Sequence, residues 1–136
     1  MKNIPETNNS PVLRTDFSDE SRWNSLCSEI LQPNADGFRA YVEFINDPEF
    51  DNLTVDQLAS IKPRDLRFVF IVDKEAISNP EHPVLVVDLA DEPGRSFRVI
   101  PSEMWGVENN LSLANMDFEE FANAVDEDGV FRGFSE

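Results

Sequence analysis

Two short apolar segments near the middle of the chain constrain its fold more than any other feature of the sequence. Residues 68–72 and 84–87 are continuous runs of apolar side chains, without the polar alternation that a half-exposed strand shows. Strands of this composition are covered on both faces of a sheet. We therefore expect these two segments to be adjacent central strands.

A helix is predicted upstream of the central strands. Ser18 is a suitable N-cap for it, and Pro33 is placed to end it. Between them, apolar residues recur at helical spacing. These residues are Trp23, Leu26, Cys27, Ile30 and Leu31. They form one stripe that we expect to face the core.

Local patterns predict the next elements. Alternation of apolar and polar residues over 38–44 predicts an edge strand with one wet face. The capping-box spacing of Thr54 and Gln57 predicts a short helix over residues 55–61. The pair Pro93-Gly94 suits a tight turn, so a hairpin is expected between residues 84–87 and the following strand.

The C-terminal part is predicted to be mainly helical. Pro101 can open a short helix that runs through Trp105. A second capping box at Asp117 and Glu120 begins the last helix, which Gly129 is expected to stop. The core-facing residues of this helix are Phe118, Phe121, Ala122 and Val125.

The order of these elements indicates an α/β fold of the α+β kind, in which helices pack on a mixed β-sheet. We expect one domain over residues 11–136. Residues 1–10 are polar and lack periodicity, so they are predicted to be a flexible leader.

The chain resembles a family of small bacterial proteins that is classed as a domain of unknown function. The resemblance is carried by residues 13–19 (LRTDFSD) and by the stretch from His82 to Phe134, which contains HPVLVVDLADEPGRSFRVIPSEMWG. It implies a bacterial, single-domain protein. It assigns no catalytic residue.

The charge of the chain restricts its partners. Asp and Glu number 27 against 11 Lys and Arg, which gives a formal net charge of −16. Direct binding to nucleic acid or to an anionic membrane by charge attraction is therefore not expected. The expected partner is a basic protein surface.

The carboxylates are densest near the C-terminus. Residues 99–131 carry eight of them and no Lys or Arg. The tract ends on Asp126, Glu127 and Asp128, which we expect at the end of the last helix, where the helix dipole disfavours negative charge. Local rules tend to break at functional sites, so we expect these three acids, with Glu119 and Glu120, to form an electronegative face that contacts the partner.

Trp105, Asn109 and Asn110 lead into this acidic helix. Two interpretations of Trp105 remain open. It either anchors a partner beside the acidic face, with the two amides orienting the contact, or packs in the core under the last helix.

An alternative site uses four aspartates that follow predicted strands, Asp16, Asp73, Asp88 and Asp91. Carboxylates at strand ends can hold Mg²⁺ and a phosphorylated substrate, and they would be the catalytic residues of a metal-dependent enzyme or a ligand-binding protein. Lys74 could contact the phosphate. The competing explanation is that each Asp organises its own loop. Convergence of at least three of them on one pocket distinguishes the two.

Other chemistry has little support. The chain has one cysteine, Cys27, and one histidine, His82, which cannot form a zinc site or an ordinary nucleophile and base pair. Cys27 is expected in the core and His82 at the surface or in a turn. We predict no cofactor and no transition metal. A single cysteine and a polar N-terminus predict a soluble protein of a reducing compartment, most simply the cytoplasm.

These observations favour a non-catalytic, acidic protein-binding module over an enzyme. An inhibitor or immunity-type protein that blocks a basic target would explain both the negative charge of the chain and its lack of catalytic motifs.

Overall fold

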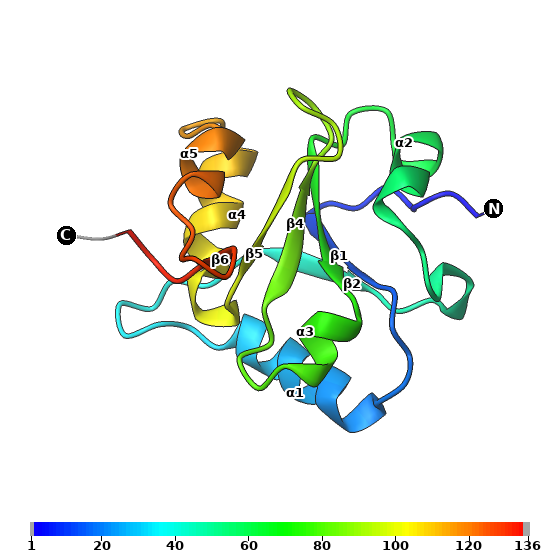
Figure 1. Cartoon of the computed structure of the whole chain (residues 1–136), viewed down its shortest axis with the longest axis horizontal. Coiled ribbons are helices and arrows are strands. Elements are labelled where there is room, and N and C mark those ends of the chain that lie inside the picture. The colour runs from blue at the N-terminus through cyan, green and yellow to red at the C-terminus, as the bar shows by residue number, and fades with distance from the viewer. Residues whose placement is uncertain (1, 135–136) are drawn as a thin grey trace.

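A six-stranded sheet, with the strand order β2-β1-β3-β4-β5-β6, forms the centre of the computed structural model, which describes residues 2–134 (Figure 1). Residue 1 of the predicted leader and residues 135–136 of the predicted domain lie outside the described residues. The strands are β1 (Ser10–Arg14), β2 (Val42–Ile45), β3 (Phe68–Val72), β4 (Val84–Asp88), β5 (Ser96–Val99) and β6 (Val130–Phe131). The sheet is mixed: β1 is parallel to β2 and β3, β4 is antiparallel to β3 and β5, and β6 is parallel to β5.

In the described part of the chain, five α-helices and three 3₁₀ turns cover the sheet. The helices are α1 (Glu20–Leu31), α2 (Leu58–Ile61), α3 (Lys74–Ser78), α4 (Met104–Ser112) and α5 (Phe118–Ala122). The 3₁₀ turns are η1 (Pro48–Phe50), η2 (Val55–Gln57) and η3 (Pro101–Glu103). No helix among residues 2–134 is long and apolar enough to cross a membrane.

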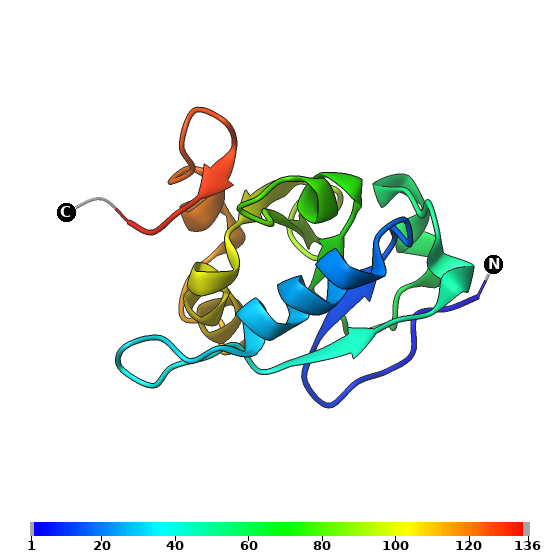
Figure 2. The ribbon, with the colours of Figure 1, turned by 90° about the horizontal axis from the view of Figure 1, so that it is seen from below.

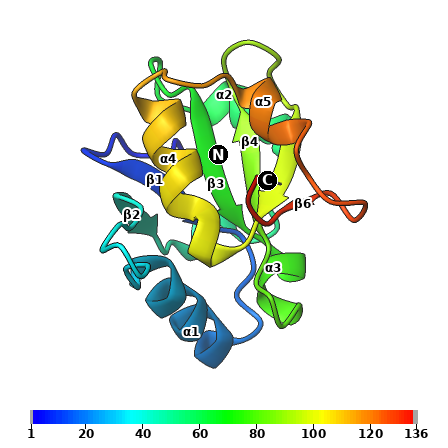
Figure 3. The same cartoon turned by 90° about the vertical axis from the view of Figure 1, so that its left-hand side faces the viewer.

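The central strands are buried on both faces, as the sequence predicts. Successive residues of β3 alternate between two core clusters: Phe70 packs with α1, α3, α4 and α5, whereas Val69 and Ile71 pack with η1 and α2. Figure 3 shows α4 and α5 in front of the sheet and α2 behind it. The predicted hairpin joins β4 to β5, with Gly94 at φ +96° in its turn.

The first half of the chain follows the predicted order with local differences. Asp19, rather than Ser18, is the N-cap of α1, because its carboxylate accepts a hydrogen bond from the N–H of Arg22 at 2.9 Å. Leu31, predicted on the core-facing stripe, is exposed in the last turn of the helix. The edge strand is β2, which begins at Val42 and not at residue 38. The capping box of Thr54 and Gln57 is present.

The helices of the second half differ more from the prediction. The helix that begins after Pro101 extends to Ser112 rather than stopping at Trp105. The last helix ends at Ala122, so the expected helix end at Gly129 is wrong. Residues 126–129 instead form a turn, in which the N–H of Gly129 donates to the carbonyl of Asp126 at 2.9 Å. Gly129 has φ +80°, which lets the chain reverse into β6.

The N-terminal segment lies along the domain. Ile4 is buried in the cluster that contains Leu58 and Ile61, and its N–H donates to the carbonyl of Ile61 at 2.8 Å. The backbone N–H groups of Asn8 and Asn9 donate to the carboxylate of Glu43 on β2. The segment predicted as a flexible leader therefore contributes an apolar side chain to the core.

Candidate functional site

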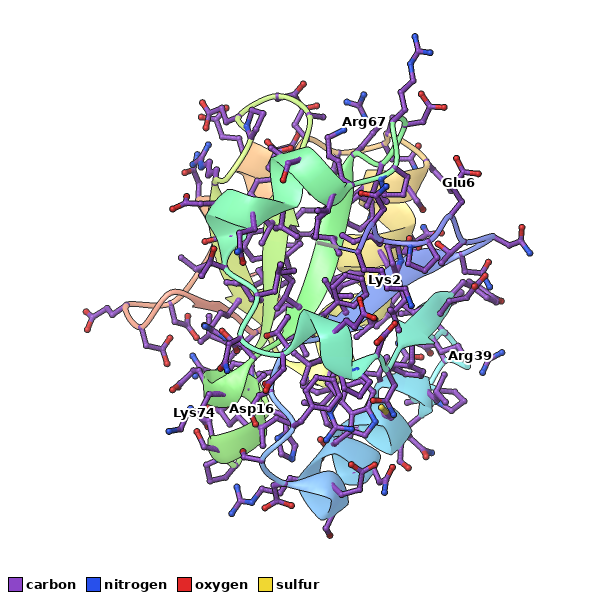
Figure 4. All side chains as sticks on the ribbon, turned by 90° about the vertical axis from the view of Figure 1, so that its right-hand side faces the viewer. Lys2, Glu6, Asp16, Arg39, Arg67 and Lys74 are labelled. Atoms are coloured by element: carbon purple, nitrogen blue, oxygen red, sulfur yellow. The ribbon has the colours of Figure 1, made fainter. Side chains whose placement is uncertain are left out.

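The four strand-end aspartates lie at opposite ends of the sheet. Asp16 and Asp73 follow the parallel strands β1 and β3, whereas Asp88 ends the antiparallel strand β4, opposite Phe68 at the start of β3. In Figure 4, Asp16 lies near Lys74 at one end, and Arg67, which is 3.9 Å from Asp91, lies at the other. Each end of the sheet therefore holds two of the four aspartates, and no three of them converge on one pocket. The common site predicted for them is wrong.

Most of these aspartates organise the backbone around them. Asp73 caps α3 through the N–H of Ala76 at 3.1 Å and binds the guanidinium of Arg98 with both carboxylate oxygens, at 2.9 and 2.7 Å. Asp88 accepts hydrogen bonds from two backbone N–H groups of the hairpin, and Asp16 accepts one from Ser18. Among the described residues, no group of three or more His, Cys, Asp or Glu is placed to hold a metal ion.

Two aspartates at the end of the acidic tract bind an arginine that follows them. Arg132 donates hydrogen bonds to Asp126 at 2.8 Å, to Asp128 at 2.7 and 3.1 Å, and to Glu81 at 2.8 and 2.9 Å. These hydrogen bonds hold the pKa values of Asp128 and Glu81 below their usual range and raise the pKa of Arg132. Glu127 is exposed, and in the described part of the chain it has no ion-pair partner within 4 Å.

The other predicted acids belong to a second cluster. Glu120 closes the capping box by accepting from the N–H of Asp117, and Glu119 lies 4.0 Å from Arg95. A small hollow of about 140 Å³ between the β4–β5 hairpin and α5 is lined by Asp88, Asp91, Glu92, Arg95, Asp117, Phe118 and Glu119. Glu119 and the Asp126–Asp128 turn are therefore paired with different arginines, Arg95 and Arg132. The premise that three acids lie at a helix end is wrong.

Trp105 lies at the surface on the first turn of α4. Its ring stacks on that of Phe38, with centroids 5.2 Å apart and planes inclined by 14°. Phe38 is 54% exposed and Tyr41 is 60% exposed, while Trp105 is partly buried. We call these three residues the aromatic surface. Phe38 was predicted on the buried face of the edge strand, but it precedes the strand, which begins only at Val42, and its ring is exposed, whereas Ala40 of the same predicted face is buried.

The loop that carries Phe38 has a defined shape. The side-chain oxygen of Asn34 accepts hydrogen bonds from the N–H groups of Asp36 and Phe38, and the N–H of Asn34 donates to the carbonyl of Phe38 at 2.8 Å. Gly37 has φ +85° at the turn. Figure 2 shows this loop projecting from the body of the domain after α1. The projecting backbone is thus fixed by Asn34, which holds Phe38 over Trp105.

Tyr41 is fixed through a buried acid of α4. Glu108 is 5% exposed, and its two carboxylate oxygens accept from the N–H of Tyr41 at 3.0 Å and from the hydroxyl of Ser10 at 2.9 Å. Glu108 lies three residues after Trp105, hence on the same side of α4. It thereby fastens the helix to β1 and to the segment that enters β2. Its position in an acidic tract gave no sign of this role.

The two predicted amides have different surroundings. Asn110 donates to the carbonyl of Gly106 within α4 at 2.8 Å, so its amide is used by its own helix. Asn109 is exposed and lines an open hollow of about 480 Å³ between α4 and the start of β1, together with Tyr41. Asn109 therefore extends the aromatic surface, whereas Asn110 does not.

The aromatic surface and the Asp126–Asp128 turn lie apart. In Figure 3 the loop that bears Phe38 and Tyr41 lies to the left of α4, and the turn before β6 lies on the right. The expectation that Trp105 lies beside the acids at 126–128 is wrong, because those acids fold toward Glu81 and Arg132.

The two remaining side chains with possible reactivity, His82 and Cys27, are packed within the fold. His82 is buried in a turn, where its Nδ1 atom lies 2.8 Å from the carbonyl of Ala76, and its Nε2 atom lies 3.9 Å from Glu29. Burial raises the pKa of Cys27 to about 12, although nearby Arg14 acts in the opposite direction. A thiol with this pKa is a poor nucleophile.

Comparison with known proteins adds one finding. A family model described as a domain of unknown function (DUF6924) matches residues 9–134, which agrees with the resemblance seen in the sequence. No curated protein matches the chain.

Proposed function

The chain belongs to the DUF6924 family, and we propose that it is a non-catalytic protein-binding module that blocks a basic partner, in the manner of an inhibitor or immunity-type protein. The observation that carries the proposal is the stack of Phe38 on Trp105 at the surface, with the exposed Tyr41 three residues further along the same segment. Aromatic residues with large, rigid and partly exposed rings are the usual anchors of protein interfaces.

The charge of the protein supports a basic partner. A net charge of −16 attracts a positively charged surface over a distance and accelerates its association. Diffuse attraction of this kind does not select one basic protein from another. The aromatic surface supplies the specific contact, because its geometry is fixed by Asn34 and Glu108 before a partner binds.

The arrangement of polar groups favours binding over catalysis. Asp73 is engaged by Arg98 and by the N-terminus of α3, and Asp88 and Asp91 lie at the far end of the sheet from Asp16. We place the protein in the bacterial cytoplasm, in keeping with its single cysteine and with the sequence resemblance.

Affinity capture with matched variants tests the proposal. The full chain, Trp105→Ala and Phe134→Ala are each immobilised and exposed to a lysate of the source organism, and bound proteins are quantified by mass spectrometry. Phe134 is the control because it is an aromatic residue that is 53% exposed and contacts Phe121 and Phe131 rather than the aromatic surface. We expect a basic protein that binds the full chain and Phe134→Ala, is lost with Trp105→Ala, and elutes with salt.

The proposal fails if every captured protein binds Trp105→Ala as well as it binds the full chain. It also fails if elution of the Trp105-dependent protein is independent of salt, because charge would then play no part in its recognition.

A further inference from the structure

We propose that the C-terminal end of α1 forms a receptor for one arginine side chain of the basic partner. This inference rests on the proposed function and specifies which group of the partner is recognised. The receptor is a hollow of about 330 Å³ between the end of α1, the loop before β4 and η3. We call it the helix-end hollow and define it by Glu29, Asn34, Glu81 and Pro101.

The electrostatics of the hollow favour a cation. α1 is a twelve-residue helix with no basic residue in its last turn, so the partial negative charge of its terminal carbonyl groups has no cationic neighbour on the helix itself. Glu29 belongs to this last turn, and its side chain is 53% exposed, with the buried His82 ring as its basic neighbour at 3.9 Å and no hydrogen bond or Lys or Arg ion pair of its carboxylate among residues 2–134. Glu81, on the facing loop, is already bound by Arg132. Glu29 is therefore the carboxylate that can pair with an incoming positive charge.

The walls of the hollow suit the stem of a long side chain. Pro33, Pro80, Ile100 and Pro101 line it and present apolar surface. Arginine and lysine both bury their methylene stems along such surface while keeping the charged head at a polar end. Arginine fits better here, because its planar group carries five N–H donors that can reach a carboxylate and several carbonyl oxygens together.

The hollow adjoins the aromatic surface. Asn34 lines the hollow, and it also forms the backbone hydrogen bond that holds Phe38 against Trp105. Ser102, another residue of the lining, precedes Trp105 by three positions. A partner segment that packs on Phe38 and Trp105 therefore passes the mouth of the hollow, where one of its arginines can enter.

The test uses a small arginine probe in place of the partner. N-acetyl-arginine amide is titrated into the full ¹⁵N-labelled chain, and amide chemical shifts are followed by NMR. We expect saturable shifts at Gln32, Asn34 and Ser102, and no saturable shifts with N-acetyl-citrulline amide, which has nearly the same shape without the charge. Glu29→Gln is expected to weaken binding roughly threefold. Asp56→Asn, which removes an exposed acid in η2, is expected to change nothing.

The outcomes separate this inference from the proposed function. The inference is overturned if citrulline binds as well as arginine, if shifts spread over the acidic surface without saturation, if Glu29→Gln has no effect, or if N-acetyl-lysine amide binds as tightly. A captured partner that still depends on Trp105 would then leave the proposed function standing. Saturable binding of arginine at the hollow, with capture independent of Trp105, would instead retain the hollow and reject the proposed function.

Discussion

Arg132 donates two hydrogen bonds to Asp128, four residues before it, at 2.7 and 3.1 Å. The same guanidinium binds Glu81 in the loop before β4 with both of its carboxylate oxygens. Arg132 therefore links the turn before β6 to the loop before β4. Two acids of a tract that has no basic residue of its own are thus paired in the fold with the next basic residue along the chain.

Replacing Arg132 is expected to change how stability depends on pH. Arg132 lowers the pKa values of Asp128 and Glu81 in the folded protein. A lowered pKa contributes stability that is present above the unfolded pKa, about 3.9 for Asp and about 4.3 for Glu, and is lost as the pH falls through the folded pKa. In Arg132→Gln this loss below about pH 4.5 should be smaller than in the unmodified protein, and stability at neutral pH should be lower.

Urea unfolding between pH 3 and pH 7 measures this difference. Arg64→Gln is the control, because it also removes one positive charge, and the exposed Arg64 has no carboxylate within 4 Å among residues 2–134. Equal pH profiles for the two variants would show that the hydrogen bonds of Arg132 contribute nothing beyond its charge.

The fold could be predicted from the sequence where one physical signal dominated. The apolar runs of β3 and β4 identified the centre of the sheet, because short continuous apolar runs rich in Val, Ile and Phe are typical of strands covered on both faces. The capping box at Thr54 located η2 and α2 because both of its hydrogen bonds are local. Helix ends were predicted less well. The helix end expected at Gly129 was wrong because residues 126–129 form a turn, an arrangement that the apolar spacing of Phe121 and Val125 does not reveal.

The site was less predictable, because it depends on contacts between distant segments. Trp105 was identified as a candidate, but its partner Phe38 is 67 residues away and was assigned to a buried strand face. Glu108 is buried by hydrogen bonds to Ser10 and Tyr41, which no pattern within α4 indicates. Asp73 was placed correctly after a strand, yet its role follows from Arg98 on β5, which only the topology brings near.

Arg14 provides a second prediction about stability. It is 1% exposed at the end of β1, and its guanidinium carbon lies 4.3 Å from the ring centre of Phe17 and 4.9 Å from that of Trp23. One of its terminal nitrogens has no hydrogen-bond partner within residues 2–134. Its ion-pair partner, Glu20, is 68% exposed. Arg14→Ala should cost about 3 kcal/mol or more, because packing between two aromatic rings is lost.

Arg14→Met keeps most of that packing and should lower the free energy of unfolding by less than about 1.5 kcal/mol. The oxygen atoms that lose Arg14 as a partner are close enough to the surface for water to replace it. Denaturant unfolding of both variants measures the difference. If Arg14→Met is as damaging as Arg14→Ala, the charge and not the stem of Arg14 stabilises the end of β1.

Cys27 should be unreactive while the protein is folded. Its pKa of about 12 leaves almost no thiolate at pH 8, where an exposed cysteine is partly ionised. Reaction with a disulfide reagent should therefore be at least about a hundredfold slower than in the unfolded chain. The reaction is followed by absorbance at pH 8, with and without guanidinium chloride. A native rate close to the unfolded rate would mean that the thiol is open to solvent.

Trp105→Ala separates the two interpretations of this residue. Its ring is partly exposed, and Phe38, on which it stacks, is 54% exposed. The variant therefore loses mainly one aromatic pair, which contributes about 0.5–1.5 kcal/mol to the free energy of unfolding, together with some apolar contact. A tryptophan in the core would cost about 3–5 kcal/mol. We expect the smaller cost in denaturant unfolding, and a loss of about 2 kcal/mol or more in affinity for a partner isolated by capture.

Phe38→Ala is the matched variant, because it removes the other ring of the stack from a loop whose backbone Asn34 holds independently. Both variants should weaken partner binding, and the double variant should lose less affinity than the sum of the two single losses, because the rings act as one surface. If both singles lose stability at the level of core truncations, the stack serves to fasten the loop to α4. Unchanged affinity in both variants would remove the aromatic surface from the recognition site, whatever their stability.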